Sequence, residues 1–228
     1  MVHRLAKPIE SFADVFDVRH FDNVDHAVGG AHPEVHMLCC VDPRSDRRHF
    51  KRPPGTVVMP SRFAANIPAD QRLAKDLINT HVLAETKGAK FFGIKIHSDC
   101  AAAGICLEFA KAGAPSGHPQ AALTNLVLAD LWELNIDLVR ASRLAFEEAE
   151  GCQELAINLL AKDLSRASLR NYWEWKVSQN MTKTVGAAVQ DGDISLAVVF
   201  ADYQKEGFEY LDPETFEFRT YDPTSSST

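Results

Sequence analysis

Residues 55–97 constrain the fold of this chain most strongly, because they predict a strand, a helix and a second strand joined by short connections. GTVVMP, at positions 55–60, is a short apolar run, and KFFGIKIH, at 90–97, is another. Between them, residues 69–88 carry apolar side chains at helical spacing and end at a glycine, a common helix C-cap. Strand–helix–strand units of this kind build parallel sheets, whose ligands gather at the carboxyl ends of the strands.

The segments on either side of this unit extend the same architecture. VHMLCCV, at positions 35–41, predicts a buried strand that ends where DPRSD begins. From residue 99 to about residue 180 the chain is almost wholly helical in pattern, and a short helix follows to about residue 190. Glycines at positions 113, 117 and 151 divide the long stretch, which therefore predicts several helices.

Three later runs alternate between apolar and polar residues and predict an antiparallel edge of the sheet; they span 194–202, 207–212 and 215–222. The predicted fold class is therefore α/β: a central, mostly parallel β-sheet with an antiparallel edge strand, flanked by helices. The chain is long enough for one sizeable domain, so we expect residues 1–228 to form a single domain. The last residues, about 223–228, predict a flexible tail.

The composition excludes some classes of function. A formal net charge of −7 and a pI near 5.7 argue against a nucleic-acid-binding protein, because phosphate backbones require a basic surface. The five cysteines form no regular framework, no secretory signal is recognisable, and no apolar stretch is long enough to span a membrane. We therefore expect a reduced, cytoplasmic protein without nucleic-acid or membrane partners, in which grouped cysteines act as ligands or nucleophiles.

Two of the predicted strands end in residues that bind metals. Cys40 lies at the end of the run 35–41, and His97 ends the run 90–97, three positions before Cys100. Adjacent parallel strands would bring these ends together, which would place two thiolates and one imidazole at a single edge. Zinc binds such ligands tetrahedrally, and a catalytic zinc commonly has three protein ligands and a fourth position for water. The sequence therefore predicts a Zn²⁺ site formed by these three residues.

The same residues carry a resemblance to a known family. C-x-D-x-R, at positions 40–44, followed by H-x-D-C, at 97–100, resembles the patterns C-x-D-S-R and H-T-D-C-G of the β-class carbonic anhydrases. Three other segments are similar to family segments: GTVVMPSRFAAN at 55–66, SLRNY at 168–172 and the closing stretch 192–212. The resemblance covers most of the chain. The helical segment from about 113 to 165 has no clear counterpart and is predicted to be an enlargement.

This resemblance implies an activity and a role for each of five residues. Cys40, His97 and Cys100 would hold zinc, and the implied reaction is the reversible hydration of carbon dioxide to bicarbonate by a zinc-bound hydroxide. Asp42 would either pair with Arg44 and orient the hydroxide, or leave the arginine and become the fourth zinc ligand. Arginine suits this role because its guanidinium group can hold a carboxylate through two hydrogen bonds. The resemblance further implies a homodimer or a multiple of dimers.

Other thiols offer alternatives to this ligand set. Cys39 competes with Cys40, but neighbouring strand residues face opposite sides of a sheet, and the spacing of the family pattern selects Cys40. His36 and Cys39 also spell H-x-x-C, although the ends of this spacing point apart on a strand. Cys106 and Cys152 lie in helical patterns among apolar residues, and we expect both in the core. No pattern identifies the residue that transfers the proton to solvent.

Three positions depart from the family pattern and leave the substrate open. Pro43 stands where serine is usual, and Ile96 and Ala101 stand where glycine is common. Bulkier residues there would narrow the site or change which small molecule fits it. The alternative substrates are therefore carbonyl sulfide and carbon disulfide, which proteins similar to this family hydrolyse. A third alternative is a non-catalytic relative that keeps the zinc and serves in binding or assembly.

Overall fold

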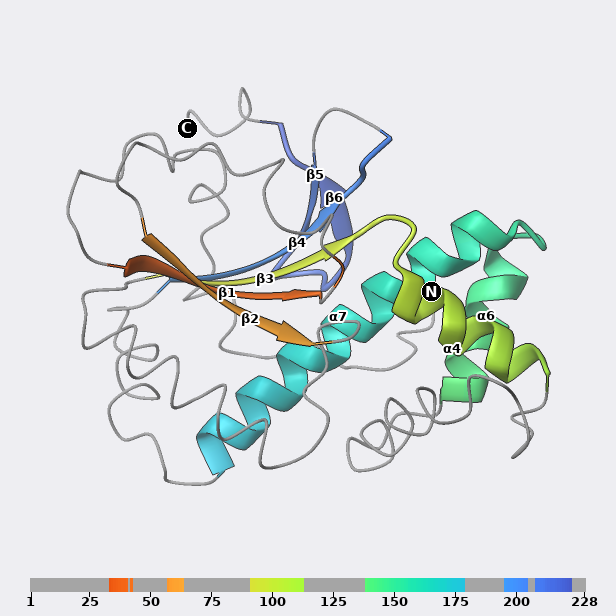
Figure 1. The fold of residues 1–228 in the computed structure, drawn as a ribbon, viewed down its shortest axis with the longest axis horizontal. Coiled ribbons are helices and arrows are strands. Elements are labelled where there is room, and N and C mark those ends of the chain that lie inside the picture. Colours follow the sequence, from red (N-terminus) through yellow and green to blue (C-terminus); the bar gives the residue numbers. More distant parts are fainter. Residues whose placement is uncertain are drawn as a thin grey trace.

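The computed structural model describes residues 33–40, 42, 57–63, 91–112, 138–178, 195–204 and 208–222. Within these residues the chain forms a six-stranded sheet in the spatial order β2-β1-β3-β4-β5-β6 (Figure 1). The strands are β1 (Pro33–Cys40), β2 (Val57–Phe63), β3 (Phe91–His97), β4 (Ser195–Ala201), β5 (Phe208–Leu211) and β6 (Phe218–Thr220). Each strand lies within two or three residues of a run that the sequence predicted.

The pairing of the strands confirms a mostly parallel sheet with an antiparallel edge. β1 pairs in parallel with β2 and β3, and β3 pairs in parallel with β4. β5 and β6 add to the far side in antiparallel fashion. The placement of 194–202 in the antiparallel edge was therefore only partly right, because β4 completes the parallel part. The reason is its near-continuous apolar sequence, with residues 197–201 all buried, which is typical of an interior parallel strand.

Three helices are described: α4 (Ala101–Lys111), α6 (Leu138–Glu148) and α7 (Gln153–Ser178). Figure 1 shows α7 running across one face of the sheet, with α4 and α6 beside the ends of the strands. Gly151 ends α6 as predicted: its φ is +83°, and its N–H donates to the carbonyl of Phe146 at 3.1 Å. None of the described helices is both long and apolar enough to cross a membrane.

Some predictions fall on other parts of the chain. The predicted helix at 69–88, the short helix to about 190 and the tail at 223–228 lie outside the described residues. So does the first part of the enlarged helical segment, at 113–137, whereas 138–148 and 153–165 are helical as predicted. The single-domain organisation of residues 1–228 stays a prediction.

The core lies between the sheet and the three helices. Its strand residues include Cys40, Ile96 and Phe200, which come from three neighbouring strands. Its helix residues are largely alanines, which let α4, α6 and α7 pack closely because a methyl group takes little space. The alanines are Ala103 on α4, Ala141 and Ala145 on α6, and Ala156, Ala161 and Ala167 on α7. This packing places the beginning of α4 directly beside the ends of β1 and β3.

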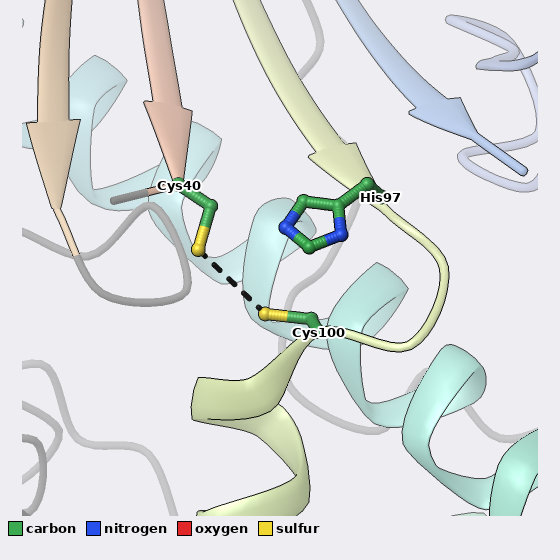
Figure 2. A group of neighbouring side chains, drawn as sticks. All are labelled: Cys40, His97 and Cys100. Carbon is green, nitrogen blue, oxygen red and sulfur yellow. Dashed lines mark hydrogen bonds between the residues drawn. The ribbon is translucent and has the colours of Figure 1, made fainter. Parts of the chain in front are cut away.

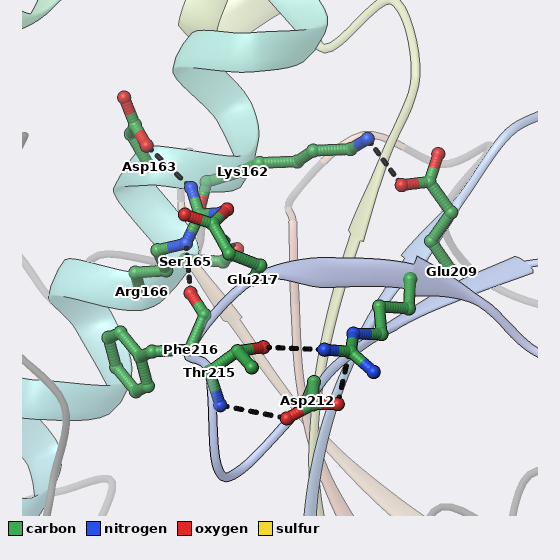
Figure 3. A network of polar contacts seen from close by, with 10 residues as sticks. Lys162, Asp163, Ser165, Arg166, Glu209, Asp212, Thr215, Phe216 and Glu217 are labelled. Carbon is green, nitrogen blue, oxygen red and sulfur yellow. Dashed lines mark hydrogen bonds and ion pairs between the residues drawn. The ribbon is translucent and has the colours of Figure 1, made fainter. Parts of the chain in front are cut away.

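Charged side chains attach α7 to the antiparallel edge (Figure 3). Lys162 lies 2.6 Å from a carboxylate oxygen of Glu209 on β5. Arg166 donates to Asp163 on its own helix at 2.6 Å and to Glu217, just before β6, at 2.9 Å. These groups are partly or fully buried, so their contacts fix the position of α7 more firmly than surface ion pairs would.

Candidate metal centre

The candidate metal centre forms where β1 and β3 end. Cys40 is the last residue of β1, and His97 is the last residue of β3. The two strands are adjacent and parallel, with Cys39 paired to Lys95, so their carboxyl ends meet at one edge of the sheet. The chain then turns through residues 98–99, and Cys100 occupies the N-cap position of α4. Two strand ends and one helix start therefore deliver the three side chains to one place.

Hydrogen bonds tie the connection after β3 to the neighbouring strand β4. The N–H of Ser98 donates to the carbonyl of Ala201 at 2.9 Å. The N–H of Tyr203 donates in turn to the hydroxyl of Ser98 at 2.8 Å. The next residue, Asp99, has a φ of +51°, a left-handed conformation that side-chain-bearing residues adopt infrequently. The chain thus reverses sharply between His97 and Cys100.

The donor atoms of Cys40, His97 and Cys100 all lie within 4.8 Å of one another. The two sulfur atoms are 3.8 Å apart, and all three residues are buried, with 0–1% of their surface exposed. Figure 2 shows the three side chains converging, with one edge of the imidazole ring turned toward the sulfur atoms. The three ligands that the sequence predicted are therefore brought together.

The hydrogen bonding of the His97 imidazole leaves one ring nitrogen available to bind a metal. Its Nδ1 lies 2.8 Å from the carbonyl oxygen of Ser98, which can only accept a hydrogen bond, so Nδ1 carries the proton. Nε2 then has a free lone pair, and it finds no hydrogen-bond partner among the described residues although it is fully buried. A backbone carbonyl that fixes the tautomer in this way is a common partner of metal-binding histidines.

The thiol of Cys100 is harder to ionise beside Cys40. The pKa of Cys100 is raised well above its usual value, first by the hydrogen bond with Cys40, then by burial and by repulsion between the two sulfur atoms. Backbone N–H groups of Ala102 and Ala103, in the first turn of α4, act in the opposite direction. A divalent cation would remove the repulsion. Together with the orphaned nitrogen of His97, this soft N/S donor set fits zinc.

The other predicted site residues have different outcomes. A carboxylate oxygen of Asp42 lies 4.0 Å from Nε2 of His97, so Asp42 borders the group without a direct hydrogen bond to that nitrogen. Arg44 and Pro43 lie outside the described residues. Ile96 is fully buried in the same apolar cluster as Cys40 and Cys100. The roles of Asp42 and Arg44 stay predictions.

The remaining cysteines test the alternatives. Cys39 is buried but is not in the group that could hold a metal. Cys106 is buried on α4 as expected, and burial raises the pKa of its thiol to about 12. The expectation for Cys152 was wrong: it is exposed, because it belongs to the turn between α6 and α7 rather than to a helix. For His36, only the backbone in β1 is described.

No role was predicted from the sequence for two residues near the centre, Tyr203 and Lys95. The ring of Tyr203 stacks on the ring of His97, with centroids 5.0 Å apart and planes inclined by 20°. No local pattern in the sequence indicates this contact. Lys95 on β3 is only 2% exposed, which is unusual for a charged residue. A lysine in a strand that is otherwise apolar is the signal that could have marked it.

Comparisons with known proteins define the fold. No protein-family model matches the sequence, and no curated protein matches it significantly. Among solved structures, the chain is similar to the β-carbonic anhydrase CcaA, with 19% identity, a TM-score of 0.57 and 88% of each chain covered. It is also similar to the β-carbonic anhydrase CafA of Aspergillus fumigatus, with 20% identity, a TM-score of 0.52, and 86% of this chain and 80% of the other covered.

A third similar structure is the Coccomyxa β-carbonic anhydrase in complex with acetazolamide. The identity is 18% and the TM-score 0.50, with 90% of this chain and 77% of the other covered. All three similarities extend over most of the chain. This chain has the fold of the β-carbonic anhydrases.

Proposed function

We propose that this protein is a zinc-dependent carbonic anhydrase, which catalyses the reversible hydration of carbon dioxide to bicarbonate. The observation that carries the proposal is the buried group of Cys40, His97 and Cys100, whose donor atoms lie within 4.8 Å of one another. The sheet places this group at the carboxyl ends of parallel strands, where α/β proteins bind their ligands. The family fold supports the same activity.

Each residue has a definite part in the proposed reaction. Cys40, His97 and Cys100 would hold the ion, and the hydrogen bond from His97 Nδ1 to Ser98 keeps Nε2 available for it. A bound zinc ion lowers the pKa of coordinated water to about 7, so that a nucleophile for carbon dioxide exists at neutral pH. Asp42 would accept a hydrogen bond from that water, and Arg44 would hold the carboxylate in place.

Asp42 also has a second possible role in this proposal, as a fourth ligand that closes the site. Its carboxylate is 10% exposed and lies 4.0 Å from Nε2 of His97, near enough to reach an ion held by the group. Replacement of Asp42 by asparagine distinguishes the two roles. Loss of activity with unchanged zinc affinity favours the orienting role, whereas weaker zinc binding favours the ligand role.

The test is a measurement of metal content together with the rate of carbon dioxide hydration. We expect one zinc per chain in the purified protein and proton release in a stopped-flow assay with a pH indicator. Cys100→Ala should lose both. Cys106→Ala is the matched control, because it removes a buried thiol from the same helix outside the group, and it should keep both. Absence of zinc from the native protein, or equal losses in the two variants, would contradict the proposal.

The same samples decide between substrates. Carbonyl sulfide hydrolysis releases hydrogen sulfide, which can be measured beside carbon dioxide hydration. Sulfide release that exceeds carbon dioxide hydration would replace the proposed substrate, and zinc binding with neither activity would indicate a non-catalytic relative. We also propose that the chain acts as a homodimer or a multiple of dimers, which sedimentation of the zinc-loaded protein would test.

A further inference from the structure

The segment between His97 and Cys100 sets the distance between two of the proposed metal ligands. It consists of only Ser98 and Asp99, and Asp99 adopts a left-handed backbone conformation with φ of +51°. Aspartate adopts this conformation more readily than most residues with a side chain, but still infrequently, so contacts with neighbouring groups help to hold it. The question is which groups hold these two residues.

On one side the segment is held by β4 and the turn after it. Ser98 donates its N–H to Ala201 at 2.9 Å and accepts the N–H of Tyr203 at 2.8 Å. Both contacts act on the residue directly after His97. They therefore fix the histidine end of the segment and leave the cysteine end to be held by something else.

On the other side the segment is held by α7. The N–H of Asp99 donates to the side-chain oxygen of Asn158, at 2.9 Å, across 59 positions of the sequence. This contact acts directly before Cys100, on the residue with the unfavourable conformation. It joins the ligand segment to the long helix.

The packing of α7 on α4 fixes the position of Asn158 relative to the ligand segment. Ile157, the preceding residue, contacts α4 at Gly104, where an added Cβ would lie 3.4 Å from its Cδ1. Gly104 in turn is one helical turn after Cys100 and donates its N–H to the carbonyl of that residue at 2.9 Å. The same close approach of α7 therefore supports the first turn of α4 and places the carboxamide of Asn158 against Asp99.

We propose that Asn158 is a positioning residue for the metal centre, which holds Asp99 in its left-handed conformation and so sets the separation of His97 and Cys100. The inference rests on the metal site proposed above and adds to it a residue outside the ligand motifs. Asn158 is not one of the residues that would hold the ion. It acts through the backbone of the segment that carries two ligands.

The experiment compares three variants of the full chain. Asn158→Leu keeps the shape of the side chain and removes the acceptor oxygen, and Asn158→Asp keeps an oxygen at the same place. Gln153→Met is the matched control, because Gln153 makes a similar amide contact from α7 to Glu108 on α4, at 2.8 Å, away from the ligand segment. Zinc affinity is measured by competition with a chromophoric chelator. The coordination geometry is measured by the thiolate and d–d absorption bands of the Co²⁺-loaded protein.

We expect Asn158→Leu to weaken zinc binding by about 10–100-fold, the range found when an outer-shell partner of a metal ligand is removed. Its Co²⁺ bands should shift, while Asn158→Asp and Gln153→Met keep the native affinity and spectrum. The proposal is overturned if Asn158→Leu binds zinc as tightly as the native chain, if Gln153→Met loses as much, or if Asn158→Asp does not restore binding. Failure of the native protein to bind either metal would overturn the proposed site as well. Zinc binding without carbon dioxide hydration would overturn the proposed activity alone.

Discussion

The sulfur atoms of Cys40 and Cys100 lie 3.8 Å apart although 60 positions separate the residues in the sequence. Their contact raises the pKa of Cys100 well above its usual value, so this thiol is protonated at neutral pH in the metal-free protein. Zinc binds the thiolate and must displace the proton.

We therefore expect zinc binding to release protons, and the apparent affinity to rise with pH by up to about tenfold per pH unit for each proton displaced. Calorimetric titrations in buffers of different ionisation enthalpy measure the number released. Cys100→Ala, which should not hold zinc, should show no proton release on zinc addition, whereas Cys106→Ala, which alters a thiol outside the group, should match the native protein. If the zinc affinity of the native protein stays the same between about pH 6 and pH 8, the Cys100 thiol is not protonated as expected.

Arg166 is largely buried and connects α7 to the antiparallel edge, which predicts a large effect on stability. Its guanidinium donates to Asp163 and to Glu217, and its own side chain is 13% exposed. Replacement by leucine keeps the apolar stem but removes these hydrogen bonds to charged groups. We expect the free energy of unfolding to fall by about 2–3 kcal/mol.

The control for this change is Arg143, which pairs with Glu147 on the surface of α6. The two side chains are 69% and 63% exposed, and the atoms are 3.7 Å apart. Arg143→Leu should change the free energy of unfolding by less than about 0.5 kcal/mol. Urea denaturation of both variants makes the comparison, and similar values would mean that the contacts in Figure 3 do not stabilise the fold.

The carboxyl group of Asp212 should make the free energy of unfolding depend on pH. Burial alone would raise the pKa of its carboxyl group, but hydrogen bonds from Thr215 and Glu214, with the charge of Arg219, bring it below the usual value of 3.8. Because the unfolded chain then takes up the proton first, this stabilisation is complete above the unfolded pKa and is lost as the pH falls through the lower folded pKa.

Asp212→Asn should therefore lower the free energy of unfolding at pH 7, and the difference from the native protein should shrink in the acid range below the unfolded pKa. Arg219→Gln, which removes the cation 3.1 Å from the carboxylate, should reproduce part of this behaviour. Denaturant titrations at neutral and acid pH measure both effects. A constant difference across the range would show that the carboxylate charge is not responsible.

Ser142 on α6 offers a change that should stabilise the protein. It is 2% exposed, and its hydroxyl has no hydrogen-bond partner among the described residues. Removing a buried, unsatisfied hydroxyl from a helix recovers desolvation energy, so Ser142→Ala should raise the free energy of unfolding by about 1 kcal/mol.

Ser165 is the matched control for this prediction. It is also fully buried in a helix, but its hydroxyl donates to the carbonyl of Lys162 at 2.9 Å. Ser165→Ala should therefore give no comparable gain. Thermal unfolding of the two variants distinguishes them, and an unchanged or lower melting temperature for Ser142→Ala would mean that the hydroxyl is satisfied.

Much of the site could be predicted from the sequence because it depends on local patterns. Apolar runs that end in Cys40 and His97 place both residues at strand ends, and the strand–helix–strand unit predicted at 55–97 indicated the parallel sheet in which these two strands are neighbours. The three-position spacing to Cys100 then determines most of the donor set. The strand boundaries needed only small corrections, since proline, glycine and aspartate mark where the runs stop.

The supporting contacts could not be predicted because they join distant segments. Asn158 is one polar residue in a long helical pattern, and nothing near it indicates that its partner is the N–H of Asp99. Cys152 was misplaced because the pattern of apolar residues continues across the turn that Gly151 introduces. The burial of Lys95 depends on the packing around β3, which the sequence of the strand alone does not contain.

The strand order gives the metal centre a further consequence. In the described sheet, β1 and β2 connect to the other four strands through the single seam between β1 and β3. An ion bound by Cys40 and by the His97–Cys100 segment would cross-link β1 to β3. It would close a loop of 60 positions, as a disulfide would. Amide hydrogens of β1 would then exchange with solvent far more slowly in the loaded protein, so metal occupancy would govern the rigidity of a third of the sheet.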